Sequence, residues 1–426
     1  MSRSSDRPRQ TLGTTFDPRH NSLNLLRLVL ALMVVFSHCG LGGFRDPLLM
    51  GHTTIGIVAV YGFFAISGYL IASSAERNGL FRFLWLRSIR IFPAFWACLV
   101  VTAFVFGLIA WNHQQAAAAH PCSFSCYLHA PMGPLGYIRH NFFLHINQPT
   151  IATTLNGNPW PYEWNVSIWT LFYEFSCYLI LAALALLRLL RHRVVVLVLV
   201  ACLWTVEILV GMTHPSLTPE QWAILTLVPV FLSGTLLYLF RDVIPDSRVL
   251  ALILGLLYCA SPWIPFGGPV LPFQSPITAS QAAAPLLAYP VFWLGSHLPF
   301  TRVGARNDYS YGVYVYSSPI QQLLVVLGLQ RFGFVAYLGL GLLITAPFAV
   351  ASWWLIERRA LRLRSLEIRR RQNKPSLGVP GVDAELGYHE QQTLGQTQLA
   401  DEVTSIGGSV ESRHEPGETT PMQPRS

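Results

Sequence analysis

Ten long apolar stretches constrain the fold of this chain more than any other feature of its sequence. A helix needs about 20 mostly apolar residues to cross roughly 30 Å of hydrocarbon, and lipid leaves few alternatives to helices. Only 12% of the 426 residues are charged, against about 25% in a soluble domain. The chain is therefore predicted to be an all-α, polytopic membrane protein with about ten transmembrane helices. They are expected at residues 23–41, 54–75, 91–111, 166–187, 194–212, 222–240, 249–264, 281–298, 309–330 and 332–356.

The arginines predict how these helices are oriented. All but one of the 29 basic residues are arginines, and they cluster in alternate connections between the apolar stretches. Cytoplasmic connections of membrane proteins carry an excess of Arg and Lys. Only Arg45, Arg139 and Arg331 fall in connections assigned to the outside. Both termini are therefore expected in the cytoplasm, and the chain is expected to be a multi-pass protein of the cytoplasmic (inner) membrane.

Three regions are expected along the chain. Residues 1–22 form a cytoplasmic N-terminal segment, and residues 23–361 form the membrane domain. Residues 362–426 form a basic juxtamembrane stretch and a cytoplasmic tail, which is predicted to be disordered because it lacks apolar periodicity. No cleavable signal peptide is expected, since the first apolar stretch follows a long polar segment and has no small-residue cleavage site.

Arg27 and His38 interrupt the first apolar stretch. Ionisable side chains at membrane depth are costly and usually functional. Eleven residues of helix rise about 16 Å in about three turns, so Arg27 is expected toward one membrane face and His38 toward the other. A neutral imidazole is suited to take a proton from an attacking hydroxyl, and His38 is the predicted catalytic base. The alternative is a structural histidine, which is the commoner role for a lone histidine on a helix.

Arg87 and Arg90 are the second candidate pair. Because they are three residues apart, a helix presents both on one face. They fall where a cytoplasmic connection enters the third apolar stretch. Guanidinium groups bind phosphate oxygens well, especially at a low-dielectric edge. Ordinary anchoring at the cytoplasmic face is an equally weighted alternative.

Glu174 is an intramembrane carboxylate and therefore a candidate for the functional site. Two roles are open from the residues alone. Glu174 either orients or charge-stabilises His38, or it pairs with Arg27 in a structural role. Glu207 lies in an apolar stretch without polar company, and a packing or interface role is expected for it.

The remaining polar positions have more modest predictions. Gly62, Ser67 and Gly68 are small residues that favour close helix packing over substrate contact. The tyrosines of residues 307–322 are expected to line a polar cavity. Cys122 and Cys126 are spaced for a short disulfide if their compartment is oxidising. No metal site is predicted, because the histidines near these cysteines match no zinc spacing.

Six motifs follow one another along the membrane region, from about Asn21 to Leu361. They are Arg-x10-His at Arg27 and His38, FFAISGYLI at Phe63–Ile71, Arg-x-x-Arg at Arg87 and Arg90, WTLFYEF at Trp169–Phe175, DYSYGVYVYSSPIQQ at Asp308–Gln322, and WWLIERRAL at Trp353–Leu361. Together they resemble the acyltransferase type 3 family. These integral-membrane O-acyltransferases include O-antigen, exopolysaccharide and nodulation-factor acetylases.

The resemblance implies an activity that the residues alone do not supply. Members move an acyl group, here expected to be acetyl, from cytoplasmic acyl-CoA to a hydroxyl of a cell-surface or secreted glycan or a lipid-linked glycan. On this pattern His38 is the catalytic base, and Glu174 occupies the family's carboxylate position. Arg87 and Arg90 would hold the phosphates of the donor, and Arg27 would position the donor or the transition state.

The resemblance also has a departure. Some members carry a histidine in the segment that corresponds to Tyr316–Pro319, where this chain has Ser317 and Ser318, so no catalytic role is assigned there. Acyl-CoA (acetyl-CoA) is expected as a co-substrate and no bound cofactor is expected. The expected partners are membrane lipids, the donor and the acceptor, without nucleic acid.

Three other functions are alternatives. The acceptor can be a small molecule such as a macrolide. A transporter or flippase would use Arg27, Glu174 and His38 as a relay, although the two similar halves typical of transporters are not evident. A scaffold or sensor without enzymatic activity would not need His38. The sequence leaves open the acceptor, the acyl chain, the oligomeric state, and whether transfer is direct or passes through an acylated protein residue.

Overall fold

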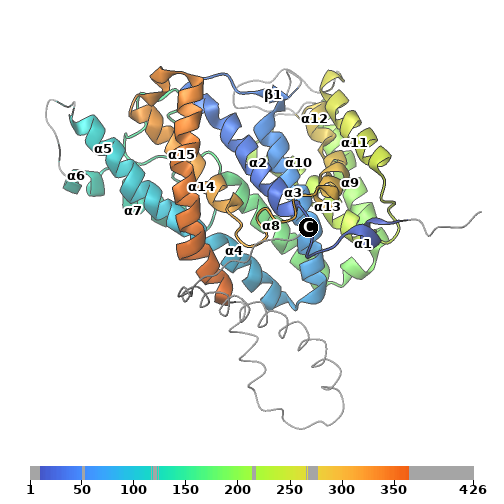
Figure 1. The fold of residues 1–426 in the computed structure, drawn as a ribbon. Coiled ribbons are helices and arrows are strands. Elements are labelled where there is room, and N and C mark those ends of the chain that lie inside the picture. Colours follow the sequence, from blue (N-terminus) through green and yellow to red (C-terminus); the bar gives the residue numbers. More distant parts are fainter. Residues whose placement is uncertain are drawn as a thin grey trace, which may run out of the picture. The chain divides into compact units, whose positions relative to one another are not determined.

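A computed structural model describes residues 10–49, 53–116, 118, 122, 124–213, 217–264, 266 and 277–363, and helices dominate these residues (Figure 1). The predicted disordered tail lies outside the described residues from position 364 onward. Two short strands, β1 (Leu48–Leu49) and β2 (Thr53–Thr54), pair antiparallel. The α-helices are α1 (Leu12–Thr15), α2 (Leu23–Ser37), α3 (Ile55–Arg77), α4 (Leu80–Val101), α5 (Gly107–Ala116), α6 (Phe124–His129), α7 (Pro134–His140), α8 (Trp169–Leu186), α9 (Arg193–Thr213), α10 (Pro219–Leu239), α11 (Arg248–Ala260), α12 (Ala279–Ala282), α13 (Ala288–His297), α14 (Ser310–Val326) and α15 (Phe334–Ser352).

Short turns of tighter or wider helix connect or extend these elements. Two of them are π-helical and continue long helices, which is common where a membrane helix also contains proline. The 3₁₀ turns are η1 (His38–Gly42), η3 (Leu189–Arg191), η4 (Ser261–Trp263), η5 (Ala284–Leu287) and η6 (Leu329–Phe332), and the π turns are η2 (Thr102–Phe106) and η7 (Trp353–Glu357).

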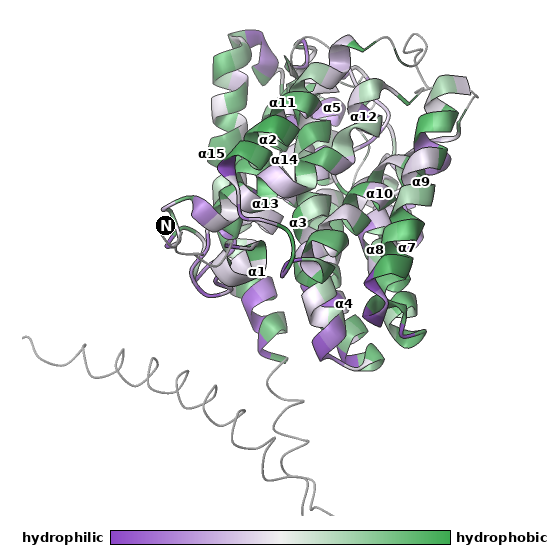
Figure 2. Cartoon of the chain, turned by 90° about the vertical axis from the view of Figure 1, so that its right-hand side faces the viewer, coloured by the Kyte–Doolittle hydropathy of each residue, from purple (hydrophilic) through white to green (hydrophobic). Residues whose placement is uncertain are grey.

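Seven helical segments of the described chain are long and apolar enough to cross a membrane, and they make the chain a multi-pass membrane protein. Each of the ten predicted stretches overlaps a helix. The stretches that contain α11, α13 and α14 are not among the seven segments, each of which has at least 18 residues. The eighth stretch is divided into α12, η5 and α13, because Pro285 and Pro290 each fit only the first turn of a helix. Figure 2 shows hydrophobic residues along most of each long helix.

The third stretch was predicted at residues 91–111, and its helix begins earlier than predicted. Helix α4 begins at Leu80, so Arg87 and Arg90 lie within the helix rather than in the connection before it. The reason is that apolar residues continue the buried face of α4 around this pair, with Phe83 and Leu86 before Arg87 and Ile89 between the two arginines. Because Arg87 and Arg90 follow the buried Phe83 at helical spacing, both arginines lie on the side of α4 that faces the protein interior.

Small residues bring α3 and α10 together at the centre of the protein. A Cβ atom at Gly68 would lie 1.9 Å from the Phe231 carbonyl oxygen, and one at Gly234 would lie 2.1 Å from the Ala65 carbonyl oxygen. Only glycine permits so close an approach of two helix backbones. The packing role predicted for Gly68 is therefore confirmed.

Helix α9 lies at the periphery. Its buried residues Val196, Val200, Glu207 and Gly211 repeat at helical spacing and form one inward face. Glu207 thus lies on the packing face, as predicted. The outward face is apolar and suited to lipid, with side chains between 44% and 62% exposed at Val194, Val195, Leu197, Val198, Val206, Leu209 and Met212.

Candidate active site

Helix α2 carries one candidate residue near each end. Arg27 lies in its second turn, and His38 follows its last residue as the start of η1. The spacing therefore separates the two side chains along the helix axis, as predicted from their positions. Helix α14 and the segment before it contact both ends. Gln321 Nε2 donates to the Val35 carbonyl at 2.9 Å, and Asp308 Oδ2 pairs with Arg27 at 3.2 Å.

His38 opens onto a cavity of about 500 Å³. Its Nδ1 shares a hydrogen bond of 3.4 Å with Ser167 Oγ. The cavity is also lined by Trp160, Trp169 and Asp46, so that aromatic surface and a carboxylate surround the imidazole. With Nδ1 engaged by Ser167, Nε2 is the ring nitrogen suited to exchange a proton with a substrate.

Helix α14 fixes the segment that carries Ser167. Asn165 Nδ2 donates to the Val315 carbonyl at 2.8 Å, and the Val166 amide donates to Ser318 Oγ at 2.8 Å. The Tyr314 hydroxyl donates to the Ser167 carbonyl at 2.7 Å. Ser318, to which no catalytic role was assigned, therefore positions the neighbour of Ser167. The sequence analysis missed Ser167, although it lies in the polar segment directly before Trp169.

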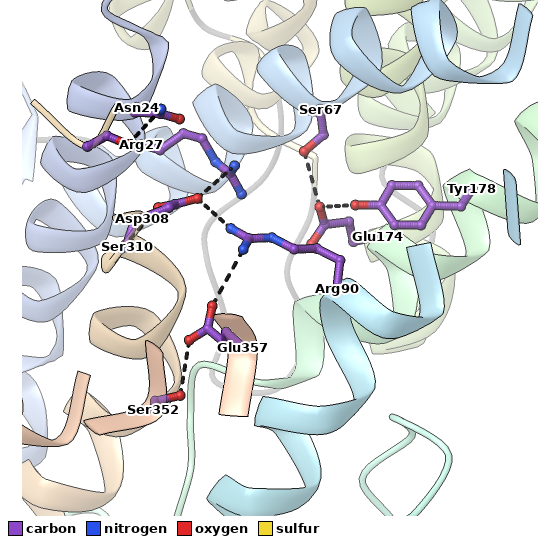
Figure 3. A network of polar contacts seen from close by, with 11 residues as sticks. Asn24, Arg27, Ser67, Arg90, Glu174, Tyr178, Asp308, Ser310, Ser352 and Glu357 are labelled. Carbon is purple, nitrogen blue, oxygen red and sulfur yellow. Dashed lines mark hydrogen bonds and ion pairs between the residues drawn. The ribbon is translucent and has the colours of Figure 1, made fainter. Parts of the chain in front are cut away.

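Charged residues form a network at the other end of α2 (Figure 3). Asp308 binds Arg27 and also makes a short contact with Arg90. Arg90 also pairs with Glu357 at 3.5 Å, and Glu357 accepts from Ser352 Oγ at 3.0 Å. Burial opposes ionisation of Asp308, yet the guanidinium groups of Arg27 and Arg90 hold its pKa below the usual range.

Sequence reasoning missed Asp308 and Glu357. Both occur in the motifs quoted above, and each is an acidic residue at the edge of an apolar stretch. That position was the available signal, because a carboxylate near lipid requires a partner. The partners come from distant parts of the chain, since Asp308 is 218 residues from Arg90.

Glu174 makes neither of the contacts suggested by the sequence among the described interactions. Its Oε1 accepts from Ser67 Oγ at 3.1 Å and from the Tyr178 hydroxyl at 2.5 Å. The ion pair of Arg27 is with Asp308. Glu174 nevertheless shares a small cavity of about 40 Å³ with Arg27, so the carboxylate lies between the two ends of the site.

Three cavities follow one another between His38 and the paired arginines. The His38 cavity and the 40 Å³ cavity share Thr170 and Tyr314 in their walls. The 40 Å³ cavity shares Arg27 with a third cavity of about 200 Å³, which Arg87 and Arg90 also line. All five predicted site residues therefore line one series of cavities, with His38 and the arginines at opposite ends.

Comparison with known proteins identifies the family of this chain. A family model described as an acyltransferase domain matches residues 20–355. The chain belongs to this acyltransferase family. The chain is also similar to an O-acetyl transferase of Shigella phage Sf6, with 28% identity over 346 residues that cover 80% of this chain and 96% of that protein. No solved structure matches the chain. In this membrane acyltransferase, His38, Glu174 and Asp308 all lie within the matched region.

Two acidic groups belong to segments around the His38 end of the acyltransferase, Glu163 in the segment before α8 and Asp46 in the connection between η1 and β1. Burial raises the pKa of Glu163 to about 7. Burial also raises the pKa of Asp46, whose buried Oδ1 has no hydrogen-bond partner in the described parts of the chain. Asp46 lines the His38 cavity, so its carboxyl group adds a polar group to that wall. Earlier in the loop that carries Glu163, Cys122 and Cys126 form the predicted disulfide.

Proposed function

We propose that this acyltransferase moves an acetyl group from cytoplasmic acetyl-CoA to a hydroxyl of a glycan on the outer side of the inner membrane. The observation that carries the proposal is the series of three neighbouring cavities, which share wall residues between His38 and the pair of Arg87 and Arg90. A donor that enters beside the arginines has a route for its thioester toward the imidazole. The acceptor enters the 500 Å³ cavity from the opposite end.

The proposed topology has ten crossings, with α11, α13 and α14 completing the seven longer spans, and both termini in the cytoplasm. It is supported by the contacts of Arg90 with Asp308 and Glu357. Arg27 near the start of the first span and Glu357 near the end of the last span belong to one network. The two ends of the membrane domain therefore share a side, which requires an even number of crossings. The excess of arginine assigns that side to the cytoplasm.

The proposed reaction is a direct transfer. His38 removes the proton from the acceptor hydroxyl, and the hydroxyl oxygen attacks the carbonyl carbon of the thioester. The new C–O ester bond forms and the C–S bond breaks. The departing thiolate of coenzyme A takes the proton from His38, which returns the imidazole to its neutral form. A base in this role contributes typically 10²–10⁴-fold to the rate.

The other site residues have supporting roles in the proposal. Ser167 holds His38 in orientation through Nδ1. Arg27, Arg87 and Arg90 bind the donor at the cytoplasmic end. Glu174, held by Ser67 and Tyr178, borders the narrow passage that the thioester must use.

Features of the outer cavity support a glycan as the acceptor. Trp160 and Trp169 offer flat apolar surface, and the carboxyl group of Asp46 adds a polar group to the same cavity wall. Sugars combine apolar C–H faces with many hydroxyl groups, so they match such a lining. The similar phage protein is an O-acetyl transferase, which supports acetyl as the acyl group.

The decisive experiment replaces His38 with alanine. We expect acetylation of the surface glycan to fall at least about 100-fold, because the variant removes the proposed general base. The measurement is NMR of the purified glycan from cells with equal amounts of inserted protein. His192→Ala, in the connection before α9, is the matched control and should retain full activity. Normal glycan acetylation in His38→Ala would refute the proposal.

The same measurement separates the enzyme from a transporter. An acyltransferase adds a neutral acyl group to the glycan, whereas a transporter or flippase changes its location without changing its mass. Arg90→Ala is expected to abolish acetylation as well, since the variant removes a donor ligand, takes the ion-pair partner from Glu357 and leaves Asp308 with Arg27 alone. Its insertion and abundance must be measured in parallel.

A further inference from the structure

A fourth cavity, of about 690 Å³, lies beside the charged network and is not among the three that reach His38. Its lining includes Arg302 and Arg306 from the connection between α13 and α14, and Asn24 from α2. It shares Asp308 with the 200 Å³ cavity of Arg87 and Arg90, so the two cavities adjoin at this carboxylate. In the sequence, these two arginines were considered only for the orientation of the helices.

The connection that carries Arg302 and Arg306 is held in place by three hydrogen bonds. Ser22 Oγ donates to the Leu298 carbonyl at 2.6 Å at its start. Asn24 Nδ2 donates to the Gly304 carbonyl at 2.9 Å, between the two arginines. Trp353 Nε1 donates to Asn307 Oδ1 at 3.0 Å near its end. The backbone beneath both guanidinium groups is therefore fixed before any ligand binds, which reduces the entropy lost on binding.

The balance of charges distinguishes Arg302 and Arg306 from the paired Arg27 and Arg90. Arg27 and Arg90 are matched by Asp308 and Glu357, so this network has no net charge when all four groups are ionised. Among the described residues, Arg302 and Arg306 take part in no carboxylate ion pair, and both are exposed at the cavity. A phosphate monoester carries a charge of about −1.5 to −2 at pH 7 and binds arginines through three strong acceptor oxygens.

We propose that this cavity binds the adenosine end of the donor, with Arg302 and Arg306 on its 3′-phosphate. The proposal rests on the proposed use of acetyl-CoA. The order of the cavities matches the order of groups in that molecule. The thioester arm lies toward the narrow passage, the diphosphate lies beside Arg87 and Arg90, and the 3′-phosphorylated nucleoside lies in the largest space.

The test compares two donors that differ only in that phosphate, acetyl-CoA and acetyl-3′-dephospho-CoA. The full chain is assayed in phosphatidylcholine nanodiscs as wild type, as the double variant Arg302→Gln/Arg306→Gln, and as the control Arg191→Gln. Arg191 lies in another cytoplasmic connection, outside the lining of this cavity. We expect the double variant to raise KM for acetyl-CoA at least about tenfold, with kcat unchanged. KM for the dephosphorylated donor should be unchanged.

Three outcomes would overturn the proposal. Equal effects of the double variant on KM for the two donors, or no effect on either KM, would mean that these arginines do not bind the 3′-phosphate. An effect seen only in nanodiscs that contain phosphatidylglycerol would assign the cavity to an anionic lipid headgroup instead. Neither result concerns the proposed function, which fails separately if the wild type uses neither thioester.

Discussion

The two ends of α2 are built from different interactions. At the end near Arg27, Arg27 and Arg90 share Asp308, and Arg90 also binds Glu357. At the end near His38, neutral hydrogen bonds hold the backbone, with Gln321 donating to the Val35 carbonyl and Ser318 accepting from the Val166 amide. A charged network tolerates the loss of one member poorly, because the remaining charges stay buried without a partner. Removing one residue from a network of neutral groups costs only the hydrogen bonds of that residue.

The largest effect is therefore expected for Asp308→Asn. The variant removes the carboxylate that Arg27 and Arg90 share, and removing one partner of a buried ion pair typically costs 3–5 kcal/mol. The thermal unfolding midpoint of the purified protein in detergent should fall strongly, together with acetyl transfer. The matched variant at the His38 end is Ser318→Ala, which removes one neutral hydrogen bond worth about 1 kcal/mol. Equal losses of stability in the two variants would contradict the comparison.

Ser167→Ala tests the comparison at the His38 end of α2. If Ser167 orients His38, its loss should lower kcat about tenfold, within the range expected for misorienting a general base, and leave KM for acetyl-CoA unchanged. The measurement is steady-state kinetics with purified protein, with Ser176→Ala on the same segment of chain as the control. An acyl-enzyme in place of direct transfer would be shown by two results together. Ser167→Ala would lose as much activity as His38→Ala, and mass spectrometry of the wild-type protein would find an acetyl group on Ser167.

The smallest effect concerns Glu163, whose pKa is raised to about 7 in the folded protein from an ordinary value of 4.5. The folded state then holds a proton that the unfolded chain releases between these two values. Stability is thus greatest at low pH and falls as the pH rises toward 7. We expect the unfolding midpoint of the wild type to drop by about 2 °C from this group between pH 5 and pH 8.

Glu163→Gln is the test of that pH dependence. The amide does not titrate, so the variant should lose this part of the decline while its midpoint at pH 5 stays close to the wild-type value. Asp17→Asn is a useful control because Asp17 is exposed and its pKa is lowered by hydrogen bonds to Arg19 and His20. An identical pH profile for wild type and Glu163→Gln would contradict the assigned protonation.

Local patterns in the sequence predicted what a single helix determines. The separation of Arg27 and His38 follows from eleven residues of one helix, and the common placement of Arg87 and Arg90 follows from helical spacing. The contact of Glu174 with Tyr178 is also local, four residues along α8, but it was not predicted from the sequence.

Contacts between distant helices were not predictable in the same way. The partners of Arg90 are 218 and 267 residues away, and no periodicity relates them. Without those positions, Glu174 was the only evident carboxylate for Arg27, and the sequence offered the wrong partner. The start of α4 was misplaced for a related reason, since hydropathy alone does not distinguish an arginine in a connection from one on a helix that faces a polar cavity.

The narrow space between the two halves of the site also bears on the integrity of the cell. It measures about 40 Å³, room for roughly three water molecules, and the ring of Tyr314 stands beside Phe63 with centroids 5.7 Å apart. A broad aqueous pore here would let protons and salts leak down their electrochemical gradients across the membrane. A space this narrow limits such a leak, and it suits the slender acyl arm of the proposed donor.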